Sequence, residues 1–249
     1  MILAVVLISA VAVGALASTS KMIHGEWRVP GATEIVRKIR SLSSSPAKPS
    51  KVIYLHRESL QVKGGGDDAT RNESSLIKGG EVRTIPRYRA SKATWRRLTR
   101  CVEGKFADYD VVVTDKRPSS GSYILVKVGG KAADIGRDNP NLGGIAPYNQ
   151  KAIPNSIVFA FDQGGRYRTK NNCDAVAHEV GHVYGLDHTY QCKDIMSYRH
   201  GCGAKVFVKK EMACGEKSTR LCEDGTQEQN SGARLLSLLG ARSEKSVLQ

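Results

Sequence analysis

Apolar residues along the chain fall into short runs that are separated by glycine, proline and polar residues. Such runs, rich in β-branched and aromatic side chains, are typical of β-strands. Between the first two runs, residues 63–80 are rich in glycine and are expected to form a loop. Strands are predicted at residues 52–55, 109–114, 123–128 and 157–161.

Two other segments, 91–105 and 229–240, carry apolar side chains at intervals of three and four residues. On a helix this spacing gathers the side chains on one face, which then packs against a core. A further helix is predicted at about 173–185. The side chains expected to pack inward are Trp95, Leu98, Cys101 and Val102 in the first segment and Leu235, Leu236, Leu238 and Leu239 in the last.

The N-terminal residues have the composition of a targeting segment. Residues 2–17 are apolar and uncharged, too short for a typical membrane span, and end in Ala15-Leu16-Ala17, a small-x-small cleavage signal. We therefore predict a signal peptide at 1–17 and a secreted protein. Residues 18–50 are interpreted as a pro-segment and linker, because they end in a stretch rich in serine and proline. Residues 51–249 then form one domain.

Six cysteines are consistent with export: Cys101, Cys173, Cys192, Cys202, Cys214 and Cys222. None is arranged as Cys-x-x-Cys, which disfavours a structural zinc ribbon. An even number of cysteines in an exported chain predicts disulfides. Six cysteines allow 15 pairings, and their number alone does not choose among them.

The run His-Glu-Val-Gly-His-Val-Tyr-Gly-Leu-Asp-His at 178–188 matches the pattern H-E-x-x-H-x-x-G-x-x-H. On a helix, His178 and His182 lie one above the other, so that both imidazoles can reach one metal ion. Glu179 is rotated by about 100° and lies close to the metal without being a ligand.

The third histidine of this run needs a different backbone path. On a continued helix His188 would lie about 240° away from His182, on the wrong side. The chain must therefore leave the helix, and Gly185 stands where a left-handed residue allows this at low cost. Three neutral imidazoles and one water make a catalytic zinc arrangement, because the fourth position stays open.

Eight residues after His188 comes Asp-Ile-Met-Ser-Tyr, at 194–198. With this turn the chain resembles the metzincin zinc endopeptidases, whose long histidine motif is followed by a methionine-containing turn. The glycines at 181 and 185 resemble those in the histidine motif of the matrixin branch. The tyrosine at 198, two residues after Met196, resembles the one found in serralysins and astacins. The resemblance is specific over residues 173–198. In this stretch the chain is most similar to secreted bacterial relatives of matrixins.

The resemblance implies an α+β fold, with a twisted mixed β-sheet, an active-site helix that carries zinc, a Met-turn and a C-terminal helix. It also implies a secreted endopeptidase in which Glu179 acts as general base on a metal-activated water. Met196 would form an apolar floor under the site, and Tyr198 would help to bind the oxyanion. The implied Zn²⁺ ligands are His178, His182 and His188. An edge segment within 142–149 would pair with extended protein or peptide substrate.

The positions of the cysteines around this site suggest their pairing. Cys192 and Cys202 bracket the Met-turn ten residues apart, and Cys214 and Cys222 lie eight residues apart. We predict these two local disulfides, which leaves Cys101 of the first helix to pair with Cys173 at the head of the histidine helix.

The net charge of +14 is concentrated in 83–100, where seven basic residues occur without an acid. Weak binding to anionic surfaces is one interpretation, and a solvated helix face is the simpler one. No nucleic-acid partner is expected, because aromatic residues are not interleaved with the charges.

A monomer is expected. The alternative function is an inactive metal-binding protein, or a basic cell-surface binder, on the same scaffold.

Overall fold

The computed structural model describes residues 22–23, 26–27 and 48–243, and the chain divides into two compact units, Met1–Pro46 and Ala47–Gln249. In the first unit, strands β1 (Met22–Ile23) and β2 (Glu26–Trp27) pair antiparallel. The predicted signal peptide at 1–17 lies outside the described residues, as does most of the predicted pro-segment. Among the described residues no helix is long and apolar enough to span a bilayer.

The second unit is built on a five-stranded mixed sheet. Its strands are β3 (Val52–His56), β7 (Val112–Thr114), β8 (Ile124–Val128), β9 (Gly144–Ile145) and β10 (Ile157–Ala160). They lie in the order β7-β3-β8-β10-β9, and β9 alone runs antiparallel to its neighbour. The strand predicted at 109–114 begins three residues late, because Tyr109 pairs with Ala241 instead of with β3.

Side chains of the main sheet alternate between its two faces, and both faces are buried. Ile53, Leu55 and Val126 belong to one apolar cluster, whereas Tyr54 and Leu125 belong to the other. This alternation follows from the two-residue period of a strand. The sheet is therefore the middle layer of the domain, which explains why its central strand β8 is apolar at four of five positions.

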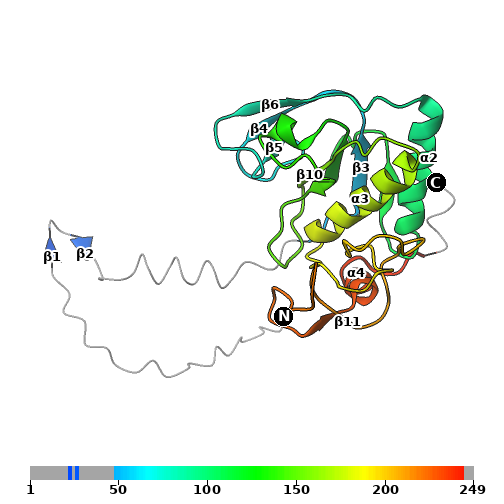
Figure 1. Ribbon diagram of the computed structural model, residues 1–249. Coiled ribbons are helices and arrows are strands. Elements are labelled where there is room, and N and C mark those ends of the chain that lie inside the picture. The colour runs from blue at the N-terminus through cyan, green and yellow to red at the C-terminus, as the bar shows by residue number, and fades with distance from the viewer. Residues whose placement is uncertain (1–21, 24–25, 28–47, 244–249) are drawn as a thin grey trace, which may run out of the picture. The chain divides into compact units, whose positions relative to one another are not determined.

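Two helices, α2 (Lys92–Lys105) and α3 (Arg168–Val183), pack together on the first face of the sheet (Figure 1). Helix α2 begins at Ser91, whose side chain accepts a hydrogen bond from Thr94 N. Helix α3 begins five residues earlier than predicted. Its first turn is polar, so that apolar spacing gives no signal there.

The other face is covered by a second, three-stranded sheet, with β4 (Leu60–Gly64) between β5 (Glu73–Ser74) and β6 (Val82–Ile85). The expectation of a plain loop at 63–80 was therefore wrong in part. Leu60 and Val62 are buried while the residues between and after them are exposed, which is the signature of a half-buried strand. A Cβ on Gly64 would overlap the Lys78 carbonyl, so this position requires glycine.

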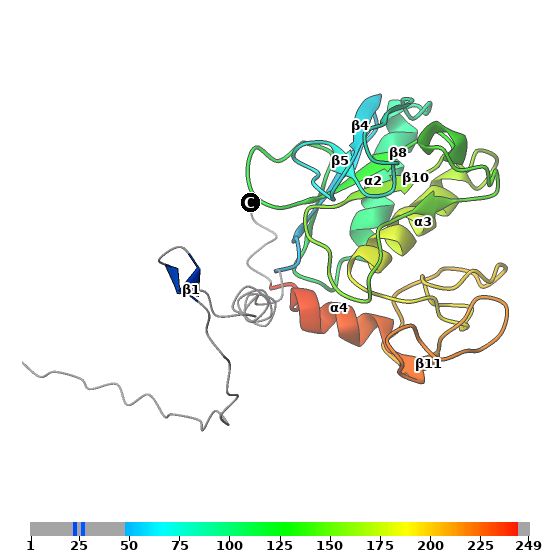
Figure 2. The ribbon, with the colours of Figure 1, turned by 90° about the vertical axis from the view of Figure 1, so that its left-hand side faces the viewer.

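The remaining chain surrounds the C-terminal helix α4 (Ser231–Leu239), which lies with β11 (Met212–Ala213) below α3 in Figure 2. Strand β11 pairs with β12 (Glu228–Gln229), and a short 3-10 helix, η1 (Ala132–Ile135), follows β8. Leu235 and Leu239 are buried as predicted. Leu236 was predicted to face the core but is exposed, because the buried face follows the i, i+4 spacing of the other two.

The structure contains the three disulfides expected from the sequence: Cys101–Cys173, Cys192–Cys202 and Cys214–Cys222. The first joins α2 to α3 within the core. The other two close loops around α4 and the end of α3. Disulfides of this kind are typical of oxidising compartments and are compatible with an exported protein.

Removal of the first disulfide should destabilise the protein most, because it closes the longest loop, with a separation of 72 residues against ten for Cys192–Cys202. Loop-closure entropy gives about 4 kcal/mol for the long loop and about 3 kcal/mol for the short one. We expect the double variant Cys101→Ala/Cys173→Ala to lose more unfolding free energy in urea than Cys192→Ala/Cys202→Ala. The opposite order would show that loop length does not determine the effect.

Candidate metal centre

Helix α3 carries the first two histidines and the glutamate of the motif in its last turns. His178, Glu179 and His182 are all buried, at 7%, 7% and 8% exposure. The Nε2 atoms of His178 and His182 lie 3.1 Å apart. The spacing of four residues therefore places two imidazoles side by side, as the sequence predicts.

The end of α3 redirects the chain so that His188 returns to the other two histidines. Gly185 N donates to His182 O at 2.8 Å and Leu186 N donates to Gly181 O at 3.0 Å, which together form a Schellman motif. Gly185 has φ +81°, and a Cβ there would lie 2.8 Å from the backbone of Gln150. This position therefore requires glycine, and the turn brings His188 Nε2 to 3.0 Å from His182 Nε2.

The protons on the first two imidazoles are assigned by their hydrogen-bond partners. His178 Nδ1 lies 2.9 Å from Ile195 O, and His182 Nδ1 lies 2.8 Å from Leu186 O. A carbonyl only accepts, so each Nδ1 carries the proton and each Nε2 presents a lone pair. Burial lowers the pKa of His178 well below its ordinary value and that of His182 to about 4, so both rings are neutral at physiological pH.

Lone pairs on nitrogen atoms 3.0–3.1 Å apart repel one another unless a cation lies between them. Two nitrogen ligands at tetrahedral angles around one zinc ion are about 3.3 Å apart, close to the observed separations. His178, His182 and His188 form a group that can hold a metal ion.

Glu179 lies between this group and the edge of the main sheet. A Cβ on Gly144 of strand β9 would be 2.6 Å from Glu179 Cγ, so the edge strand passes directly over this side chain. Burial raises the pKa of Glu179 to about 8. A nearby dication would favour the ionised carboxylate and counteract this shift. The predicted edge segment at 142–149 thus contains a strand that adjoins the candidate base.

Met196 is fully buried and belongs to the same apolar cluster as Val180 and Val183 of helix α3. A Cβ on Gly181 would overlap the Met196 sulfur, which explains the glycine inside the histidine motif. The turn is anchored by Asp194, whose carboxylate accepts from Met196 N at 2.8 Å and from Val208 N at 2.9 Å. The same carboxylate accepts a hydrogen bond from Ser231 at the start of α4. The C-terminal helix is therefore connected to the turn that contains Met196.

Tyr198 lies beside the histidines and is half exposed, at 50%. Its ring is stacked on His178 at 5.3 Å between centroids and lies 4.4 Å from the His188 ring. Burial of part of the ring raises the pKa of its phenol to about 12, so the hydroxyl keeps its proton. Tyr198 therefore presents a hydrogen-bond donor close to the metal-binding group.

Sequence reasoning missed the residues that orient His188. Its Nδ1 lies 2.7 Å from Glu216 Oε1, and Arg220 donates to the same oxygen at 2.7 Å. Arg220 also forms a bidentate ion pair with Asp187, at 2.7 and 2.8 Å. The hydrogen bonds from Arg220 lower the pKa of Glu216, which therefore stays ionised beside the imidazole.

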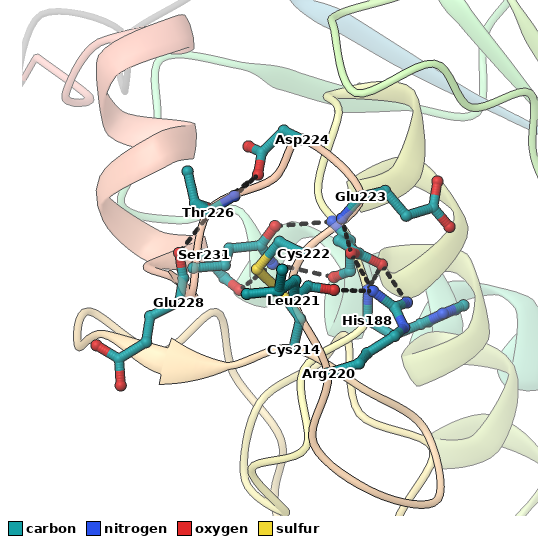
Figure 3. Close-up of a disulfide and its surroundings, with 12 residues drawn as sticks. His188, Cys214, Arg220, Leu221, Cys222, Glu223, Asp224, Thr226, Glu228 and Ser231 are labelled. Carbon is teal, nitrogen blue, oxygen red and sulfur yellow. Dashed lines mark hydrogen bonds and ion pairs between the residues drawn. A yellow bond between two sulfur atoms is a disulfide. The ribbon is translucent and has the colours of Figure 1, made fainter.

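The Cys214–Cys222 disulfide closes the loop that supplies both Glu216 and Arg220. Figure 3 shows Arg220 next to His188, with the disulfide on the other side of this loop. Glu216 lies 28 residues after His188 in a loop without a recognisable motif, so only the position between two predicted partner cysteines could have pointed to it.

Two further groups of side chains in the described part of the chain have metal-ligand distances, and neither offers a better site. One contains Cys214 and Cys222, which are joined in a disulfide and are not thiolates. The other contains Asp187 and Glu216, which both already pair with Arg220.

The arrangement unites three imidazoles, a buried carboxyl group and a phenol next to the edge strand of the main sheet. No protein-family model matches the chain, and none of the curated proteins matches it.

The Glu216–His188 contact should strengthen metal binding, because a carboxylate that accepts from Nδ1 increases the basicity of the ligating nitrogen. Glu216→Gln keeps the oxygen acceptor and removes the charge. We expect it to weaken metal affinity by about 10–100-fold in a zinc-chelator competition assay. Glu211→Gln, at an exposed site, is the matched control. Equal affinities of all three proteins would contradict this role.

Proposed function

We propose that this protein is a secreted zinc endopeptidase of the metzincin class. The observation that carries the proposal is the convergence of three imidazole Nε2 atoms directly beside the buried Glu179. Three nitrogen ligands leave a fourth position open, which is the arrangement of catalytic and not of structural zinc. The buried methionine turn and the α+β architecture agree with the resemblance found in the sequence.

Bound zinc would supply a Lewis acid that polarises the scissile carbonyl and lowers the pKa of water. Glu179 then takes the proton of the attacking water and transfers it to the leaving amine. Its environment supports this role, because a bound dication would keep the carboxylate ionised while burial, which by itself raises its pKa, keeps it basic enough to accept a proton.

Strand β9 is the proposed binding edge for the substrate backbone. It lies at the end of the five-stranded sheet and pairs with β10 on one side. An extended polypeptide on its other side would receive backbone hydrogen bonds that depend little on side chains. Because Gly144 lies against Glu179, such a peptide would pass next to the candidate base.

Tyr198 is the proposed donor to the oxyanion. Its phenol keeps its proton and its ring is held between the solvent and two histidine rings. A protonated phenol in this place can donate to an oxygen that gains negative charge in the transition state.

The competing interpretation is a metal-binding or surface-binding protein without activity on the same scaffold. It gives no role to Glu179, whose burial beside the histidines costs free energy in any protein that does not use it. Digestion of casein or gelatin with and without a chelator separates the two interpretations.

Glu179→Ala should retain zinc and lose turnover, because the three ligands are unchanged and the base is removed. Proton transfer contributes about 10²–10⁴-fold to the rate, and we expect a loss of at least this size. Zinc content and casein hydrolysis are measured on the same preparation, with Glu211→Ala as the matched control. Normal proteolysis by zinc-replete Glu179→Ala would rule out the proposed base.

Tyr198→Phe should lower kcat about 10²-fold or more and leave KM and zinc content nearly unchanged, since the lost hydroxyl acts only on the transition state. Tyr190→Phe provides a matched control, because Tyr190 belongs to the same region and its ring lies beneath Arg199 instead of beside the histidines. A Tyr198→Phe enzyme within about threefold of wild-type kcat would assign the tyrosine a packing role.

A further inference from the structure

A cleft of about 800 Å³ lies between the segment that leads into α2 and the segment that leads into α3. One wall is formed by residues 86–91 with the first turns of α2, and the other by residues 165–169. Five arginines line the cleft and no acidic side chain does: Arg87, Arg89, Arg97, Arg166 and Arg168.

Two of the five charges are already balanced. Arg168 is held in a bidentate pair by Asp162, and Arg87 contacts Glu58 at 3.1 Å. The other three, at positions 89, 97 and 166, are exposed and form no ion pair with any residue that the structure describes. Neither α2 nor α3 has an acidic residue in its first turn, so the helix dipoles add to the positive potential.

The first wall of the cleft is rigid because hydrogen bonds hold the backbone at every second residue. The buried Lys127 donates to Pro86 O at 2.8 Å, and Tyr88 N donates to Arg57 O at 2.8 Å. Arg57 in turn donates to Ala90 O at 3.0 Å. The residues between these fixed positions, 87 and 89, direct their guanidinium groups outward. A positively charged wall held in this way is preorganised for an anionic partner.

The cleft is aligned with the metal centre through α3. Glu179 follows Arg168 by eleven residues, which is about three turns, so both lie on nearly the same face about 16 Å apart. Gln163 lies two residues before Gly165 of the cleft wall, and its Nε2 donates to Gly143 O at 3.2 Å, just before β9. A peptide that extends along β9 beyond Gly143 therefore runs toward the arginines.

We propose that this cleft binds an acidic segment of the polypeptide substrate, about five residues from the scissile bond. An extended chain spans about 3.3 Å per residue, so five residues cover the 16 Å between base and cleft. Glutamate and aspartate carboxylates match the paired donors of arginine. This inference rests on the proposed peptidase function and adds a preference that the edge strand alone does not provide.

Binding is tested first without catalysis, in zinc-replete Glu179→Ala protein, with a fluorescein-labelled peptide that carries four consecutive glutamates. The cleft variant Arg89→Ala/Arg97→Ala/Arg166→Ala should weaken binding about tenfold, as expected for three exposed ion pairs. The control Lys63→Ala/Lys116→Ala/Lys210→Ala removes the same charge at exposed sites elsewhere and should bind as the parent does. Equal weakening by both variants would overturn the site in favour of general charge attraction.

The preference is tested next in the active enzyme, with one neutral peptide and two peptides whose glutamate tract lies five residues before or after the scissile bond. One acidic peptide should have a KM lower than that of the neutral peptide, by about tenfold, and the cleft variant should abolish this advantage. Neutral and acidic peptides cleaved alike by wild type would overturn the inference.

The two experiments separate this inference from the proposed function. If no peptide is cleaved, the peptidase proposal fails while the binding assay still decides whether the cleft takes acidic peptide. If heparin, used as a sulfated polysaccharide probe, binds through the three arginines and the glutamate peptide does not, the cleft is a polysaccharide site and the inference is wrong.

Discussion

Three imidazoles can present their lone pairs to one point only if each Nδ1 proton has an acceptor. This requirement explains most of the structure between α3 and α4. The acceptor for His182 is supplied by the turn that ends α3, and the acceptor for His178 by the backbone just before Met196. The third acceptor is the carboxylate of Glu216. Each acceptor has a separate structural origin, so the site depends on several parts of the chain at once.

The rest of the domain positions these parts. The buried sheet and the Cys101–Cys173 disulfide hold α3 in place, and α3 carries two of the three imidazoles. Asp194 connects the methionine turn to α4 through Ser231, which gives the last helix a function beyond core packing. Strand β9 is short and paired on one side, and its glycine allows close approach to the candidate base. The candidate metal centre is therefore held by helix α3, by the methionine turn and by the loop that supplies Glu216.

Local patterns in the sequence predicted the features that depend on local geometry. The spacing of the histidines, the left-handed Gly185 and the buried strands all follow from backbone periodicity, and all agree with the structure. The pairing of Cys192 with Cys202 could also be predicted from local sequence, since short loops close easily. The second sheet was missed because β5 has only two residues and because β4 and β6 lie next to glycines, which favour a loop. Glu216 was missed because its partner is 28 residues away, and no periodicity connects them.

The Cys214–Cys222 disulfide has a consequence for where the protein can mature. The loop that it closes supplies both the carboxylate that orients His188 and the arginine that keeps this carboxylate ionised. In a reducing cytosol the loop would lack its covalent closure, and ordering of its residues would cost more conformational entropy. Completion of the candidate metal centre is thereby coupled to oxidation. Under the proposed function, a cell that makes this chain would be protected from proteolysis until the chain reaches an oxidising compartment.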